Sequence, residues 1–159
     1  MEIPITPQRR AWGDYDCHMG PHRNKTLEDF LKTIKEVKII KKMDTPRFQG
    51  CYWFVFKNED WFKKMTETQR ESLLLTNAFE VLNSKGYHEV TKPKNRDIAV
   101  YFFNSAGERE SVVHYGRYIN GKILSKFGKE HVFEHPIEMV PDYFGNGVKF
   151  FSRQYNKTL

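Results

Sequence analysis

One β-hairpin is indicated more strongly than any other element of this sequence. Two strand-like runs, 112–119 and 122–127, are separated by Asn120-Gly121. An Asn-Gly pair supplies the positive φ angles of a type I′ turn, so the two runs are predicted to pair as antiparallel neighbours. Further strands are predicted at 98–103, buried on both faces, and at 148–151. The second half of the chain is therefore expected to form an antiparallel sheet.

The register of the hairpin decides which side chains share a face. With a two-residue turn, Gly116 pairs with Ser125 and His114 with Phe127. Side chains alternate across a strand, so His114, Gly116 and Tyr118 point to one face and the residues between them to the other. Because Gly116 has no side chain, we expect open space beside the imidazole of His114, into which a helix can pack.

Helices are expected mainly before the sheet. Thr66-Glu67-Thr68-Gln69 has the pattern of a capping box and begins an amphipathic helix that ends near Gly86. An earlier amphipathic helix is predicted over 26–37, and residues 1–25 are expected to be loop or extended arm. Helices followed by an antiparallel sheet predict an α+β protein.

Composition limits the class of protein. A chain of 159 residues with 39% apolar and 29% charged residues is most simply one compact unit. Two distant cysteines, no membrane-length apolar run and no apolar leader predict a reduced, cytoplasmic protein. The net charge of +6 fits either general solubility or an anionic partner. The densest basic group comprises Lys32, Lys35, Lys38, Lys41 and Lys42.

Cys51 is the candidate nucleophile. It opens the segment 51–56, whose aromatic residues favour a strand and whose uniform apolarity also fits a buried helix. The N-terminus of a helix would lower the thiol pKa and stabilise an oxyanion, for which the Gln49 amide is a second candidate donor. The alternative is that Cys51 is a small buried hydrophobic residue.

Two histidines are candidate partners for this thiol. A thiol needs a base to become a thiolate near neutral pH, and His114 is the candidate base. His135 is placed to hold His114 in the correct tautomer, with Glu134 and Asp97 as weaker candidates for that role. The alternatives are a half-buried strand histidine for His114 and a surface or turn histidine for His135.

Three segments of the second half carry a family resemblance: 95–101, 113–118 and 120–128. Together with Glu134-His135-Pro136, they resemble the motifs of NlpC-like, papain-related cysteine hydrolases. The resemblance covers roughly residues 48–152. It is closest to a subgroup in which the Cys helix is followed by a Trp-rich stretch, here Trp61-Phe62, and by a helix ending in Gly-Tyr.

This resemblance implies a papain-like, NlpC-type α+β domain over 48–159, with N-terminal helices packed on a C-terminal antiparallel sheet, after an arm and helix at 1–47. It also implies a cysteine hydrolase or acyltransferase acting on an amide, peptide or protein substrate. Cys51 would be the nucleophile, His114 the base and His135 the orienting residue. No metal or organic cofactor is implied. The candidate residues of the substrate cleft are Trp53, Gly116 and Ser125.

Other functions stay open beside the hydrolase. A papain-like scaffold without catalysis would serve as a binding protein, using its basic surface and N-terminal arm to hold a protein or nucleic acid. A microbial or viral anti-defence effector is a third interpretation. A group of potential metal ligands lacks the second ligand pair of a zinc site and predicts no metal; it comprises Asp14, Asp16, Cys17, His18 and His22.

Overall fold

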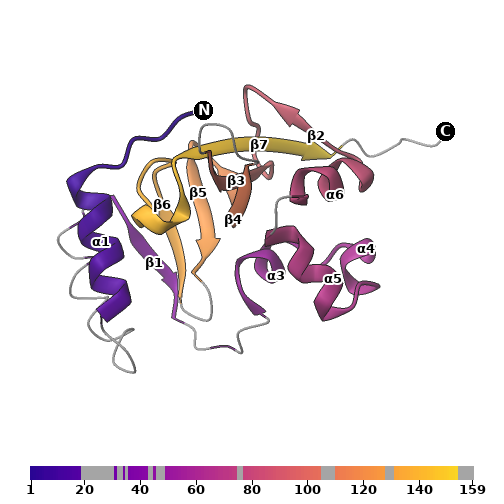
Figure 1. Cartoon of the computed structure of the whole chain (residues 1–159), viewed down its shortest axis with the longest axis horizontal. Helices are drawn as coiled ribbons and strands as arrows, with labels where there is room; N and C mark the ends of the chain where they lie inside the picture. Colours follow the sequence, from indigo (N-terminus) through magenta and orange to yellow (C-terminus); the bar gives the residue numbers. More distant parts are fainter. Residues whose placement is uncertain are drawn as a thin grey trace.

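The computed structural model describes residues 1–18, 31, 34, 36–42, 45, 49–74, 77–104, 110–127 and 131–153, without the side chains of 15–18. The described residues form a seven-stranded sheet in the order β1-β6-β5-β4-β3-β7-β2, with antiparallel pairing throughout (Figure 1). The strands are β1 (Lys38–Lys41), β2 (Tyr87–Val90), β3 (Ile98–Phe103), β4 (Ser111–Ile119), β5 (Lys122–Lys126), β6 (Val132–His135) and β7 (Gly147–Arg153).

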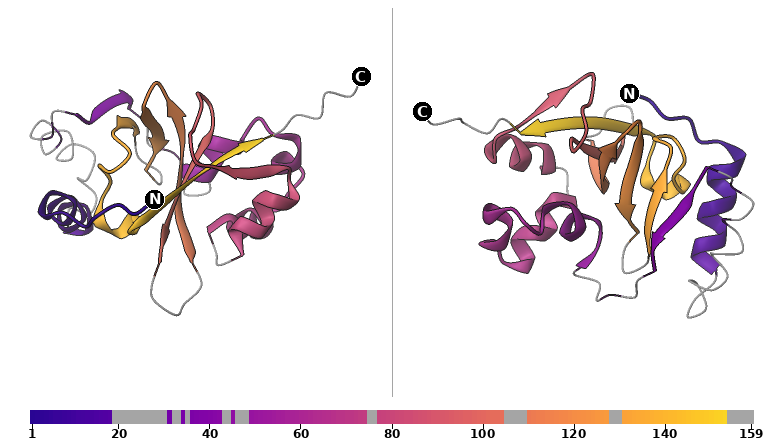
Figure 2. Two further views of the ribbon diagram at one scale, coloured as in Figure 1. Left: turned by 90° about the horizontal axis from the view of Figure 1, so that it is seen from above. Right: turned by 180° about the vertical axis from the view of Figure 1, so that it is seen from behind.

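Helices cover both faces of this sheet. α1 lies on one side and the group α3 to α6 on the other, as the two views of Figure 2 show. The helices are α1 (Pro7–His18), α3 (Cys51–Phe56), α4 (Asp60–Lys63), α5 (Glu67–Glu71), α6 (Ala78–Ser84) and the short 3-10 helices η3 (Ser72–Leu74) and η4 (Asp142–Phe144). The predicted α+β class is confirmed.

Each face of the sheet has its own hydrophobic core. On the α1 face, Trp12 packs with sheet residues such as Tyr101 and Phe133. On the α3–α6 face, helix residues such as Phe56 pack with Tyr115. These names, the α1 face and the α3–α6 face, are kept below. Because side chains alternate along each strand, a residue's face is fixed by its position in the register.

The hairpin forms as the sequence predicts. Asn120 and Gly121 have φ angles of 51° and 83°, and Tyr118 pairs with Ile123. The expected open space beside Gly116 is not found. A Cβ at Gly116 would lie 2.4 Å from Cγ2 of Ile123 and 3.1 Å from Cβ of Ser125. The neighbouring strand fills this position, and no helix enters it.

The N-terminal region contains α1, where the sequence had predicted loop. Pro7 is its first residue, a position where the missing N–H of proline costs no helical hydrogen bond. Gly13 allows α1 to approach η4, since a Cβ there would lie 1.8 Å from Oδ1 of Asp142. Pro7 and Gly13, residue types that usually interrupt helices, thus start this helix and let it pack.

Arg9 fixes α1 to the rest of the protein. Its side chain is 1% exposed and donates to five backbone carbonyls. Burial lowers the pKa of the guanidinium, and the charge of Asp142 acts in the opposite direction. The accepting carbonyls are those of Ile3, Pro4, Val140, Pro141 and Gly145.

Two helix predictions need correction. Most of the helix predicted over 26–37 lies outside the described residues. Leu31 is helical as predicted, whereas Ile34 and Val37 are not. Lys38 and Lys41 belong to strand β1. Lys32 and Lys35 lie outside the described residues.

The second correction concerns the helix predicted from Thr66 to Gly86. It begins with the expected capping box but is divided into α5, η3 and α6. The carbonyl of Leu73, in η3, accepts a hydrogen bond of 2.5 Å from the Tyr115 hydroxyl of β4.

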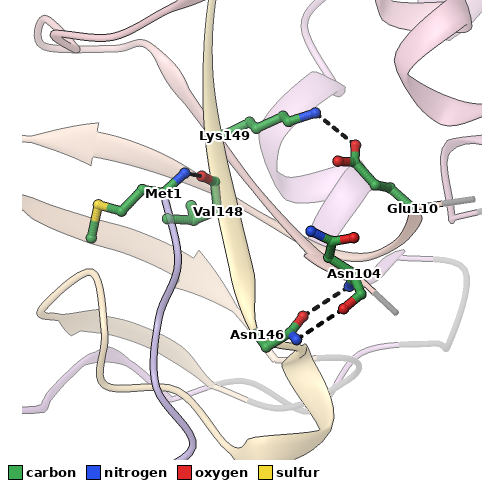
Figure 3. Close-up of polar contacts among 6 residues, drawn as sticks. All are labelled: Met1, Asn104, Glu110, Asn146, Val148 and Lys149. Carbon is green, nitrogen blue, oxygen red and sulfur yellow. Dashed lines mark hydrogen bonds and ion pairs between the residues drawn. The ribbon is translucent and has the colours of Figure 1, made fainter. Parts of the chain in front are cut away.

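Polar contacts fix β7 at its beginning (Figure 3). Asn146 accepts from the backbone N–H of Asn104 at 2.8 Å and donates to its carbonyl at 3.1 Å. Lys149 donates to Glu110 at 2.6 Å. The backbone of Met1 exchanges hydrogen bonds with Val148, so the first residues extend the sheet beside β7. None of the described helices is long and apolar enough to span a bilayer.

Candidate functional site

Cys51 is the first residue of α3, directly after Gly50. Its side chain is 7% exposed and belongs to the core of the α3–α6 face. Burial raises the pKa of the thiol to about 11, although the backbone N–H groups of Tyr115, Tyr52 and Cys51 itself, and the charge of Lys126, act in the opposite direction. The thiol is therefore protonated at neutral pH.

His114 lies on the α1 face, in β4 opposite Tyr101. Its ring stacks on Phe144 with centroids 4.0 Å apart and an interplanar angle of 7°, and Phe127 meets it edge-on at 5.2 Å. The Nε2 atom is buried without a hydrogen-bond partner. Burial, and secondarily His135, hold the pKa of His114 well below its ordinary value. An aromatic cage thus keeps the imidazole neutral.

His135 is bonded to two groups other than His114. Its Nδ1 lies 2.8 Å from the carbonyl oxygen of Pro136, and its Nε2 lies 2.7 Å from Oγ of Ser125. A carbonyl only accepts, so Nδ1 carries the proton and Nε2 accepts from the Ser125 hydroxyl. Burial lowers the pKa of His135 to about 4, against the Pro136 carbonyl, which favours the charged form.

The structure brings the two histidines together and separates them from Cys51. Tyr115 shares a core with Cys51, while its neighbour His114 faces the opposite side of β4. Among the described residues, no hydrogen bond joins the thiol to either imidazole. In this arrangement the sheet lies between the predicted nucleophile and the predicted base.

The remaining predicted site residues are likewise divided between the two faces. Gln49 precedes α3, and its carbonyl accepts from Thr45 Oγ1 at 3.5 Å. Trp53 is half-buried in α3 and holds the ammonium of Lys57 4.7 Å from its ring centroid. Gly116 and Ser125 lie on the other face, beside the histidines.

The alternative orienting residues have other partners. Glu134 lies 3.4 Å from the ammonium of Lys122. Asp97 accepts from the backbone N–H of Lys94 at 2.8 Å and so stabilises the turn before β3. No cluster of three or more potential metal ligands occurs in the part of the chain that the structure describes.

A pocket of about 640 Å³ lies between α4, α5 and α6. Trp61 and Val81 contribute apolar surface, and Lys64 and Lys85 contribute ammonium groups. The remaining lining residues are Met65, Gln69, Ser72 and Ser84.

None of the predictions from the sequence included this pocket. The sequence does contain a pattern that could have indicated the pocket, namely helical spacing of its lining residues. Trp61, Lys64 and Met65 lie at positions i, i+3 and i+4 of one stretch. Val81, Ser84 and Lys85 have the same spacing in a second stretch. Each stretch presents an apolar residue and a lysine on one side of its helix.

No curated protein and no solved structure matches the chain. A family model matches residues 39–152, from within β1 to near the end of β7, which is most of the chain. α1 and Arg9 precede the matched region. The chain therefore belongs to the family described as "Domain of unknown function (DUF7689)".

Proposed function

We propose that this chain is a binding protein that holds an anionic partner at the pocket between α4, α5 and α6. The charge of the lining carries the proposal. Lys64 and Lys85 are its charged residues, with no carboxylate among the lining residues described. Within the described chain neither lysine forms an ion pair. Two unpaired ammonium groups beside apolar surface favour an anion.

The proposal retains the papain-like scaffold of the sequence resemblance. The order of elements supports it, because a helix with Cys51 at its N-terminus precedes six of the seven described strands, β2 to β7, and packs on β4 and β5. A scaffold of this kind can keep its fold without catalytic activity. A thiol pKa of about 11 and imidazoles on the opposite face favour binding over catalysis at Cys51.

Titration with a short glutamate peptide tests the proposal. We expect changes in backbone amide chemical shifts around Lys64 and Lys85, and weaker binding as the salt concentration rises. The double substitution Lys64→Gln, Lys85→Gln removes these changes. The matched control is Lys57→Gln, which removes another lysine of the α3–α6 group, one that contacts Trp53 and does not line the pocket. Shifts centred on Lys38 and Lys41 would overturn the assignment to this pocket.

The predicted cysteine hydrolase or acyltransferase is the second candidate. Its support is the position of Cys51, where three backbone N–H groups and the charge of Lys126 favour the thiolate. These groups also suit a developing oxyanion. Catalysis would require His114 to reach the sulfur in a different arrangement of β4.

Thiol labelling separates the two candidates. A hydrolase requires that iodoacetamide at neutral pH modify Cys51 far faster than Cys17, and that His114→Ala abolish this difference. The binding proposal predicts slow modification of Cys51, at a rate that His114→Ala leaves unchanged.

A further inference from the structure

We propose that the pocket between α4, α5 and α6 takes a small aromatic carboxylate, whose ring lies on Trp61 and whose carboxylate lies between Lys64 and Lys85. This inference rests on the proposed function and narrows its ligand to an anion with a flat apolar body. The pocket volume of about 640 Å³ lies in the range of small-molecule sites.

The indole of Trp61 is fixed on its protein side. Phe56, Phe62 and Tyr87 surround it with ring centroids 5.0, 6.0 and 6.1 Å away. Trp61 is nonetheless only half-buried and lines the pocket. An aromatic surface held in place by three other rings can accept a flat ligand without reorganising.

The polar groups of the pocket mainly offer donors. The Lys85 ammonium lies 6.0 Å from the ring centroid of Trp61, and the Lys64 ammonium is the second charged donor. Gln69 accepts from the backbone N–H of Thr66 through Oε1, which leaves its NH₂ group as a third donor. An acceptor that carries negative charge complements this set.

The two hydroxyls of the lining already donate to their own helices. Ser72 donates to the carbonyl of Gln69 at 2.5 Å and Ser84 to that of Val81 at 2.6 Å. The specificity therefore comes from the lysines and the carboxamide. Trp61, Met65 and Val81 supply the apolar contact that a bare anion would not use.

Fluorine NMR with a fluorinated naphthoate tests the inference. We expect it to bind about tenfold more tightly than the naphthamide of the same ring and than trifluoroacetate, which has the charge without the ring. Lys64→Gln and Lys85→Gln should each weaken naphthoate binding about fivefold or more. Lys57→Gln should leave it within about twofold, because that lysine lies outside the pocket.

The outcomes distinguish this inference from the proposed function. If trifluoroacetate and the glutamate peptide bind as tightly as naphthoate, the ring has no role, and the inference fails while anion binding stands. If naphthamide binds as tightly as naphthoate, the carboxylate has no role and the inference fails, while the glutamate-peptide titration still decides the proposed function. If none of the probes binds, the glutamate peptide included, both fail. Trp61→Phe keeps an aromatic ring and should retain charge selectivity with weaker binding; an unchanged affinity would contradict stacking on Trp61.

Discussion

Two buried histidines of the α1 face have different hydrogen-bonding states. His135 bonds through both ring nitrogens, whereas Nε2 of His114 has no partner. Removing a side chain that is hydrogen-bonded to buried groups leaves those groups without a partner, which lowers stability. Removing a side chain that has no hydrogen-bond partner leaves no such group behind. The same substitution at the two positions should therefore have unequal effects on stability.

We expect His135→Leu to lower the free energy of unfolding by about 2–4 kcal/mol, because the Ser125 hydroxyl and the Pro136 carbonyl lose their partner. His114→Leu should change it by less than about 1 kcal/mol. Urea unfolding of the two variants checks this difference. Equal losses would show that His114 has a partner of similar strength.

The separation of Cys51 from His114 shows what the sequence could predict at single residues. Alternation along β4 correctly put His114 and Gly116 on one face. The alternation could not predict on which face of β4 the helix α3 would pack. The other face offers Arg117, whose guanidinium donates to the Val55 carbonyl at 2.6 Å, as an equally good contact for a helix. Both faces of β4 are rich in buried residues, so the pattern favours neither.

Among the elements, α5 depends on its capping box. Thr66 accepts from the backbone N–H of Gln69 at 3.2 Å, and Gln69 accepts from that of Thr66 at 2.8 Å. We expect Thr66→Ala to lower the free energy of unfolding by about 1 kcal/mol. Thr68→Ala, at an exposed position inside the same helix, should have little effect or stabilise slightly. Thermal unfolding of both variants checks this; equal losses would contradict a role for the cap.

The packing of α1 on η4 gives a second prediction. Alanine favours helices over glycine, yet Gly13→Ala should destabilise the protein, because its Cβ would collide with Asp142. A double-mutant cycle with Asp142→Ala should show a favourable coupling of about 1 kcal/mol or more, because the smaller residue removes the collision. Additive effects would show that α1 is not held this close to η4.

The two kinds of element were not equally predictable. The hairpin and the capping box depend on local chemistry, namely the positive φ angles of Asn120 and Gly121 and the reciprocal bonds of Thr66 and Gln69. α1 depends on distant contacts, because the carbonyls that Arg9 binds include those of Val140 and Gly145. Because arginines are mostly exposed in proteins, the sequence gives no sign that Arg9 is buried.

At the scale of the whole molecule, buried neutral groups set the pH range of stability. His135 has a pKa of about 4 in the fold against 6.5 ordinarily, so the unfolded chain gains its proton first as the pH falls. The contribution of the neutral His135 to the free energy of unfolding is therefore complete above about pH 6.5 and is lost as the pH falls toward 4. The thiol of Cys51 behaves in the opposite way, with a pKa of about 11 against 9.0, so its contribution is lost as the pH rises above about 9.

We therefore expect the free energy of unfolding to be nearly constant between about pH 6.5 and 9 and to fall on either side, by about 3 kcal/mol from His135 alone on the acid side. Urea unfolding across this range measures it. Cys51→Ala should flatten the alkaline limb between about pH 9 and 10 and leave the acid limb unchanged. Above about pH 10 a decline remains, because burial also raises the pKa values of Tyr52, Tyr87, Tyr101 and Tyr115. An acid limb that begins only below pH 4 would contradict a neutral, buried His135.

The two outer strands of the sheet have a consequence for how this protein behaves at high concentration. β1 has four residues, with Lys38 and Lys41 exposed, and β2 has four, with His88 and Glu89 exposed. A sheet with long, uncharged edge strands can pair through its backbone with strands of other molecules and so form fibrils. The short, charged edge strands β1 and β2 offer an approaching strand little backbone to pair with. High protein concentration should therefore not cause aggregation by edge-to-edge strand pairing.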